Sequence, residues 1–186
     1  MRGILTTFLL FGSCVCFAQG ETSAPARRAT WVSVGGGLGT LTSSGGFCGR
    51  LSLSHQHGRH VYTLRAFRIT EFIGDMVEPR SPRPEESETE LAILYGRDIS
   101  SGGEYFACSI GIGYINSRHR GGLLNQPPFG LMHELSSVGS IGIAFDVQVF
   151  FPLLRFFGVG LSFVGNLNTT RSFGGGLLSI QAGFFE

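Results

Sequence analysis

Residues 140–149 alternate strictly between two kinds of side chain. One set is hydrocarbon throughout, and the other set is small or polar and includes the carboxylate of Asp146. Because side chains on a β-strand point alternately to opposite faces, this segment predicts a strand with one continuous apolar face. Asp146 does not interrupt that face, since it belongs to the other one. The segment is therefore interpreted as one strand of a sheet rather than as a buried helix.

The same period of two recurs along the chain and predicts about eight strands. It is weaker in residues 31–40 and 47–57. In residues 60–72 it is ambiguous, because two sets of apolar side chains compete for the same face. The proposed strands cover residues 31–40, 47–57, 60–72, 89–97, 104–115, 140–150, 156–166 and 173–185.

The segments between the proposed strands support this division. Proline cannot donate a backbone hydrogen bond to a sheet, and all seven prolines fall outside the proposed strands. Long or intermediate connections alternate with short ones, as expected of an outer-membrane barrel with short periplasmic turns and longer external loops. In chain order the predicted connections are residues 41–46, 58–59, 73–88, 98–103, 116–134, 151–154 and 167–172.

The composition of the two faces indicates which one lies inside. A soluble barrel carries its charges outward, whereas a membrane barrel shows hydrocarbon to lipid and packs small and polar groups in its lumen. Here the apolar face holds no Lys or Glu, and the other face is rich in Gly, Ser and Ala. An eight-stranded barrel encloses side chains but no open channel. The prediction is an all-β fold, a closed antiparallel transmembrane β-barrel of about eight strands in an up-and-down meander.

Aromatic residues predict two girdles on this barrel, one near each membrane surface. The predicted periplasmic girdle consists of Tyr62, Tyr95, Phe106, Phe150, Phe157 and Phe184. The predicted outer girdle consists of Phe47, Phe72, Tyr114 and Phe163.

The N-terminus has the pattern of a secretory signal peptide. Arg2 precedes a mostly apolar stretch, and Cys16 and Ala18 occupy the two positions that a signal peptidase reads. We expect a signal peptide at 1–18, a short periplasmic segment at 19–29 and the barrel at 30–186. Acylation of Cys14, as in a lipoprotein, is an alternative. The chain contains no Lys, and no basic stripe is available to hold nucleic acid.

With its signal peptide, its alternating loops and its last strand, the chain resembles the small eight-stranded outer-membrane β-barrels, the outer-membrane protein A/X-like family. The last ten residues read LLSIQAGFFE. The resemblance implies that outer-membrane insertion machinery recognises this strand, although Glu186 follows the terminal aromatic residue. It also implies a bacterial outer-membrane location, outer-membrane lipids as surroundings, and a structural or surface-interaction role through the external loops.

Four charged residues are predicted to face the lumen: Arg50, Arg65, Glu90 and Asp146. Buried charges in a narrow lumen must be paired. We therefore expect a salt-bridge cluster that plugs the barrel, with Asp146 paired to Arg50 or Arg65. Glu104 and Gln148 extend the cluster toward the periplasmic end. The alternative is a conducting pore lined by the same groups.

Other motifs carry weaker functional hypotheses. His55 and His57 have a spacing that could bind a metal, but no acid or Cys accompanies them, which favours solvated turn residues. His133, Glu134 and Ser137 suggest a lipid-modifying enzyme as an alternative, although the motif matches no known pattern. A secreted soluble barrel that binds a small apolar ligand is a further alternative. No cofactor is implied.

Two further features concern the loops and the thiols. Residues 73–88 and 116–134 are predicted to be large external loops that present a binding surface. Cys48 and Cys108 are predicted to lie on opposite faces, and we expect both to be free thiols because a disulfide needs neighbouring Cβ atoms.

Overall fold

The structure is a computed structural model that describes residues 28–41, 44–72, 86–100, 105–126 and 130–185. For residues 122–126, 130–134 and 185 it describes the backbone alone. The predicted signal peptide and Glu104 lie outside the described residues. None of the described residues forms a helix long and apolar enough to span a membrane.

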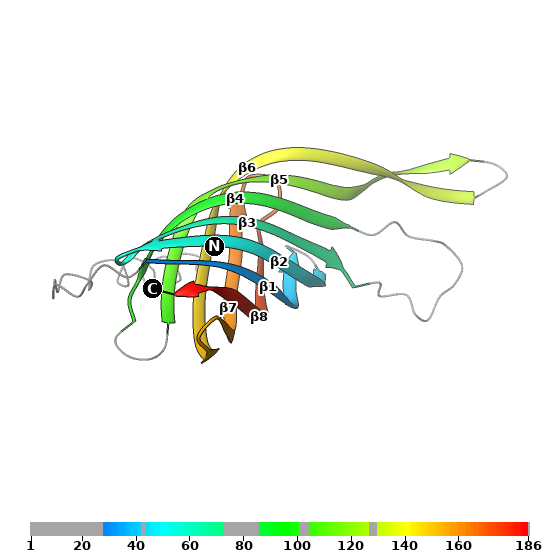
Figure 1. Cartoon of the computed structure of the whole chain (residues 1–186). Helices are drawn as coiled ribbons and strands as arrows, with labels where there is room; N and C mark the ends of the chain where they lie inside the picture. The colour runs from blue at the N-terminus through cyan, green and yellow to red at the C-terminus, as the bar shows by residue number, and fades with distance from the viewer. Residues whose placement is uncertain (1–27, 42–43, 73–85, 101–104, 127–129, 186) are drawn as a thin grey trace, which may run out of the picture.

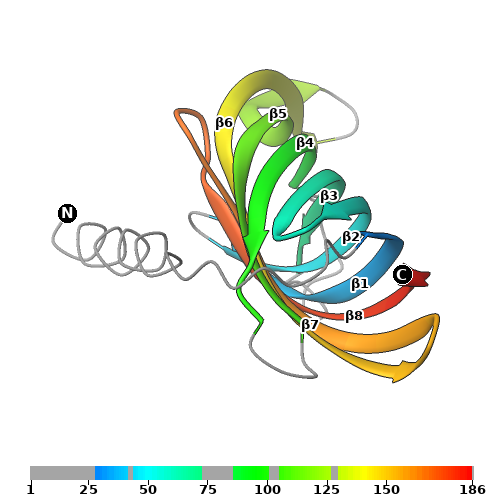
Figure 2. The ribbon, with the colours of Figure 1, turned by 60° about the vertical axis from the view of Figure 1, so that its left-hand side comes forward.

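Eight antiparallel strands form one closed barrel in simple chain order, and β1 pairs with β8 to complete the ring (Figures 1 and 2). The predicted fold class is confirmed. The strands are β1 (Arg28–Leu41), β2 (Ser44–His57), β3 (His60–Glu71), β4 (Ser87–Asp98), β5 (Tyr105–Gln126), β6 (Gly130–Leu154), β7 (Phe157–Asn168) and β8 (Phe173–Phe185).

The register shows that the strands are inclined to the barrel axis. A row of paired residues that starts at His57 on β2 passes once around the barrel and returns to β2 at Phe47, ten residues away along the strand. Such a stagger is required to close a sheet and corresponds to a strand tilt of about 40°. A row of paired residues therefore climbs along the barrel as it goes around.

The outer face of the barrel is mostly hydrocarbon. Large apolar side chains are exposed at many positions, and Ile93 and Ile141 are 72% and 70% exposed. So large an apolar surface is favourable only where lipid or another apolar partner covers it. On β3, the strand with the ambiguous pattern, Tyr62 and Leu64 face out, whereas Val61 and Arg65 are buried inside. The inward residues of this strand are Val61, Thr63, Arg65, Phe67 and Ile69.

The lumen is filled in three layers. A middle layer contains the four predicted charges beside a small apolar cluster of Ala92, Leu94 and Ala144. An apolar layer at one end packs Ala29, Trp31 and Val61 against Tyr105, with the Trp31 and Tyr105 rings edge to face at 5.3 Å. The apolar layer at the other end consists of Leu41, Cys48, Phe67, Ile69, Ile115, Val164, Phe173 and Leu177.

Two elements are longer than expected. Strands β5 and β6 have 22 and 25 residues, whereas the other strands have 12 to 14. The prediction of an external loop at 116–134 is therefore wrong. The two strands continue through this region and pair with each other up to Gln126 and Gly130, with a register shift between Arg120 and Leu123. No sign of these strands is visible in the sequence, because hydrophobic alternation is lost in residues 116–134. The backbones of β5 and β6 nevertheless pair with each other there.

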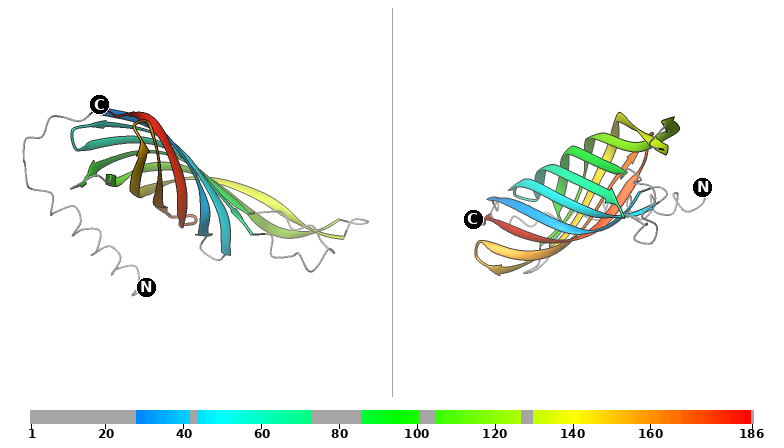
Figure 3. Two further views of the ribbon diagram at one scale, coloured as in Figure 1. Left: turned by 60° about the horizontal axis from the view of Figure 1, so that its bottom comes forward. Right: turned by 90° about the vertical axis from the view of Figure 1, so that its right-hand side faces the viewer.

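The projecting part of β5 and β6 defines the two ends of the molecule. We call the end from which it extends the hairpin end, and the opposite end the turn end (Figures 1 and 3). The turn end carries the β2–β3, β4–β5 and β6–β7 connections and the last residues of β8.

Three smaller expectations are corrected. Pro152, expected outside the strands, lies within β6. The pairing of β6 with β7 shifts register beside it, at a point where a backbone N–H of residue 152 is not needed for a hydrogen bond between the strands. The turn that follows is at residues 155–156 rather than 151–154. Phe150, assigned to the outward periplasmic girdle, is 2% exposed inside the lumen because Asp146 and Gln148 set the same inward face.

Candidate functional site

The four predicted charges lie together in the middle of the lumen as one ion-pair network. Arg50 donates from Nη1 to both carboxylate oxygens of Asp146, at 3.1 and 3.0 Å. Arg65 donates from Nε and Nη2 to Glu90 Oε1, at 2.9 and 2.6 Å. Arg65 Nη1 also lies 3.6 Å from Asp146 Oδ2 and links the two pairs. All four side chains are fully buried.

Neutral partners extend the network. Arg50 Nη2 donates to Ser33 Oγ at 3.1 Å, and Arg65 Nη1 donates to the Phe145 carbonyl at 2.8 Å. Asn166 Nδ2 donates to Glu90 Oε2 at 2.7 Å. Two positive and two negative charges thus balance, and each carboxylate is hydrogen-bonded, as charges removed from water must be.

Two glycines make room for one arm of the network. Gly113 and Gly142 face each other across β5 and β6. A Cβ atom on Gly113 would lie 3.0 Å from Asn166 Nδ2 and 3.1 Å from the Glu90 carboxyl carbon. A Cβ atom on Gly142 would overlap the Asn166 amide oxygen and lie 2.7 Å from the Asn168 Cβ. The absence of side chains at these two positions therefore allows the Glu90–Asn166 hydrogen bond.

Ion pairs at the hairpin end cross the mouth of the barrel. Arg171, between β7 and β8, hydrogen-bonds Glu86, which precedes β4 on the opposite side of the ring. Arg120 on β5 donates to Glu71 on β3 at 2.8 Å. Below them the rings of Phe67 and Phe173 stack at 5.1 Å. We refer to the four charged residues Glu71, Glu86, Arg120 and Arg171 as the mouth clasp.

The clasp holds Glu86 in its charged form. Partial burial would by itself raise the pKa of Glu86. The hydrogen bonds from Arg171 and from the backbone N–H of Arg120 outweigh it, so the pKa lies below the usual value of 4.5. A carboxylate that is stabilised by neighbouring cations stabilises the folded state in turn.

The remaining candidate residues are not brought together as a reactive site. His55 and His57 are both exposed, His55 contacts Thr30, and His60 is hydrogen-bonded to Tyr95. Among the described residues no cluster of three metal-ligating side chains exists. The side chains of His133 and Glu134 lie outside the described residues, and Ser137 donates to Asn116. Cys48 is buried and Cys108 is partly exposed, and neither forms a disulfide, as predicted.

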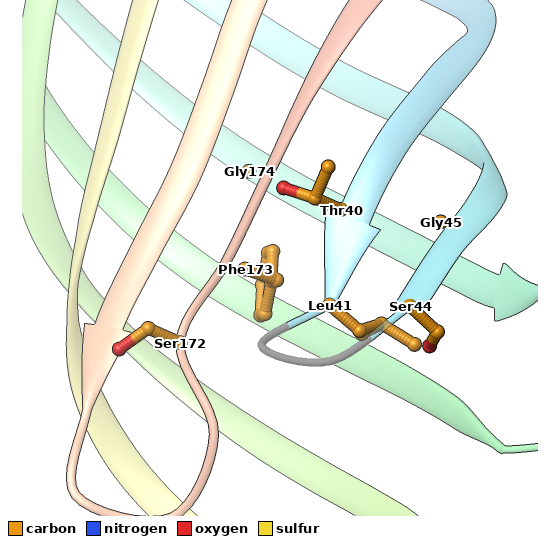
Figure 4. Close-up of a pocket in the computed structure, with 7 residues that line it drawn as sticks. All are labelled: Thr40, Leu41, Ser44, Gly45, Ser172, Phe173 and Gly174. Atoms are coloured by element: carbon orange, nitrogen blue, oxygen red, sulfur yellow. The ribbon is translucent and has the colours of Figure 1, made fainter.

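An open hollow lies at the hairpin end, beside the end of β1 and the starts of β2 and β8 (Figure 4). It has a volume of about 580 Å³ and is lined by Thr40, Leu41, Ser44, Gly45, Ser172, Phe173 and Gly174. None of these seven lining residues is charged.

The closed meander with a hydrocarbon exterior and a filled polar centre is the fold of the small eight-stranded outer-membrane β-barrels. Among solved structures it is similar to Ail, the attachment invasion locus protein of Yersinia pestis, in complex with the heparin analogue sucrose octasulfate. The TM-score is 0.55 at 9% identity, over 87% of this chain and 100% of that one.

Two further structures have the same fold. The N-terminal β-barrel domain of Pseudomonas aeruginosa OprF has a TM-score of 0.55 at 11% identity, covering 86% of this chain and 99% of that one. Neisserial surface protein A has a TM-score of 0.54 at 10% identity, covering 83% and 96%. No known protein family description matches the sequence, and no curated protein matches it either. At these identities the likeness establishes the fold.

Proposed function

We propose that this protein is a non-enzymatic barrel of the bacterial outer membrane whose lumen is plugged and whose β5–β6 hairpin serves as a surface for interaction outside the cell. The observation that carries the proposal is the contrast between the lumen and the β5–β6 hairpin. The lumen is filled with side chains in three layers, whereas two strands extend well beyond the ring. An exported chain with a signal peptide at residues 1–18 would reach this membrane, and its last strand would be read by the insertion machinery.

The plug is supported by the contacts in the lumen. A conducting pore needs a continuous water-filled path, but large buried side chains close both ends around the ion pairs. Phe67 and Phe173 stack across one end, and Trp31 packs on Tyr105 at the other. A lumen of eight strands has room for little else.

The hairpin is supported as an interaction element by its pairing. Strand β5 pairs with β4 only as far as Arg118, and β6 pairs with β7 only as far as Gly142. Beyond these residues, within the described part of the chain, the two strands pair only with each other. Their outer edges are therefore open to a further strand, a common mode of protein recognition.

Planar-bilayer recordings test the plug. Purified, refolded protein should give no stable conductance steps. A variant with Trp31, Phe67 and Phe173 all changed to Ala should give them, because it lacks an aromatic side chain at both ends of the lumen. Stable steps from the unmodified protein would overturn the plugged barrel. Heat-modifiable migration on a detergent gel verifies that each variant is folded.

Replacement of residues 121–138 by a short turn tests the hairpin. The truncated barrel should fold and insert as the full protein does, because β5 retains β4 and β6 retains β7 as partners within the ring. Adhesion of cells that carry the protein to host-cell or extracellular-matrix surfaces should fall to the level of cells without it. Undiminished adhesion after truncation would reject the hairpin as the interaction element.

A second candidate function, the binding of an anionic polymer, is favoured by the distribution of charge. Every acidic side chain in the described residues is buried or bonded to a partner, whereas Arg68 and Arg118 are exposed on the outer face toward the hairpin end. Sucrose octasulfate is a suitable probe. Its binding should weaken in the Arg68→Gln/Arg118→Gln variant and with added salt.

A further inference from the structure

The β6–β7 turn exposes large apolar side chains at the turn end of the barrel. Leu153, Leu154 and Phe156 are 60%, 58% and 61% exposed, and Phe184 on the neighbouring strand is 82% exposed. The two segments are adjacent, because the Gly183 N–H donates to the Phe156 carbonyl at 3.0 Å. These four residues form one patch, which we call the turn patch.

The other described connections at this end are polar. The β2–β3 turn reads His57-Gly58-Arg59-His60 and has exposed charge at Arg59. After β4, Asp98 accepts hydrogen bonds from Gln56 and from the Ser100 backbone. The apolar surface is therefore specific to the β6–β7 side, among the residues that the structure describes.

The register places the turn patch beyond the polar rim of the opposite side. The row His60–Arg97–Cys108–Val147 climbs toward the hairpin end by about 3 Å per strand at a tilt of about 40°. Val147 therefore stands about 9 Å nearer the hairpin end than His60. Leu153 is six residues further down β6, which carries it about 6 Å past His60 toward the turn end.

The patch is continuous with the face that the proposed function assigns to lipid. Phe151 and Leu153 extend the outward row of β6 that begins at Ile141. Arg155, exposed at the tip of the same turn, places a guanidinium where lipid phosphates would lie. A cationic tip on an apolar base fits a phospholipid surface.

We propose that the β6–β7 turn is a membrane anchor that inserts into the inner leaflet, with Leu153 and Phe156 among the acyl chains and Arg155 at the phosphates. The barrel then meets this leaflet asymmetrically, because its apolar surface reaches deeper at β6–β8 than at β3–β4. This inference rests on the proposed membrane location.

Tryptophan fluorescence with brominated lipids tests the anchor. Three variants of the full mature chain are refolded into vesicles of phosphatidylcholine and phosphatidylglycerol with brominated acyl chains. Phe156→Trp probes the turn patch, Ile112→Trp marks the middle of the outer face, and Arg59→Trp marks the polar β2–β3 turn. The native Trp31 is enclosed in the lumen, and its emission, measured on the unmodified protein, is subtracted.

The anchor predicts that bromine quenches the Phe156→Trp probe to within about twofold of the Ile112→Trp probe, with blue-shifted emission. The Arg59→Trp probe should be quenched by aqueous acrylamide instead. If the Phe156→Trp probe behaves like the Arg59→Trp probe while the Ile112→Trp probe is quenched by bromine, the anchor is overturned and the membrane location stands. If bromine quenches none of the three in folded protein, the membrane location and the anchor both fall.

Discussion

Asp146 is the residue on which the ion-pair network depends most, because it contacts both arginines. Change of Asp146 to Asn leaves two buried guanidinium groups with only Glu90 for compensation. Change of Arg50 to Gln leaves Asp146 beside Arg65. We therefore expect Asp146→Asn to lower the free energy of unfolding by about 3–5 kcal/mol, and Arg50→Gln to lower it by less.

Urea unfolding of the refolded variants in detergent micelles measures the difference. A single-step transition with an unchanged slope would assign it to stability alone. If Asp146→Asn is as stable as the unmodified protein, the ion-pair network does not stabilise the fold, and its role in holding the plug is contradicted.

Gly142 is a residue whose lack of a side chain affects how two strands pack, because it leaves space for Asn166 and Asn168. Its substitution by Ala would force Asn166 and Asn168 to move, because the new Cβ would overlap both and would lie 2.8 Å from the Leu167 carbonyl. We expect a loss of about 1–3 kcal/mol, typical of overpacking. Gly176→Ala is the matched control, since nothing lies within 4 Å of a Cβ there, and its effect should be within about 0.5 kcal/mol. Equal unfolding midpoints for the two variants would contradict the proposed role of Gly142.

At the scale of the strand, the period of two in the sequence was a sufficient guide to the barrel. Alternation sets inside and outside at every residue, and for Asp146 and Glu90 this placed the charge on the lumenal side. It could not reveal that β5 and β6 continue past the ring, because polar residues on a two-stranded ribbon carry no hydrophobic pattern. Apolar residues that fill the lumen, such as Phe67 and Phe150, are missed for the opposite reason: hydrocarbon on both faces conceals the alternation.

The network shows how far sequence can go toward a site. Alternation assigns Arg50 and Glu90 to the lumen, and the need to pair buried charges predicts that they meet partners there. Which partner each one takes depends on the ten-residue stagger, a property of all eight strands at once. Asn166 and Ser33 also belong to the network. They carry no charge, so the need to pair buried charges does not predict their role.

At the scale of the whole molecule, the mouth clasp links opposite sides of the ring through the Glu86–Arg171 pair. The pKa of Glu86 is lower in the folded state than in the unfolded chain. The contribution of the pair to stability is therefore fully present above about pH 4.5 and is lost as the pH falls through the folded-state pKa. We expect Arg171→Gln to lower the unfolding midpoint at pH 7, and we expect this difference to shrink as the pH falls below about 4.5.

Thermal unfolding of both proteins between pH 7 and pH 3 measures this difference, and Glu86→Gln serves as the control because it removes the titrating group. A constant difference between the unmodified protein and Arg171→Gln across the whole pH range would contradict the role of Glu86.

The pairing of β1 with β8 has a consequence for how the chain can be assembled. Ala29 lies opposite Phe185, so the first and last strands of the barrel are neighbours, and both outermost residues lie at the turn end. The ring cannot close until the final strand has been delivered, which makes closure the longest-range event in folding. The order of the strands is cyclic, so the pairing of the strands does not depend on which connection between them is open. A short linker from residue 185 to residue 28, with a new break in an external connection, would preserve every strand pair of the barrel.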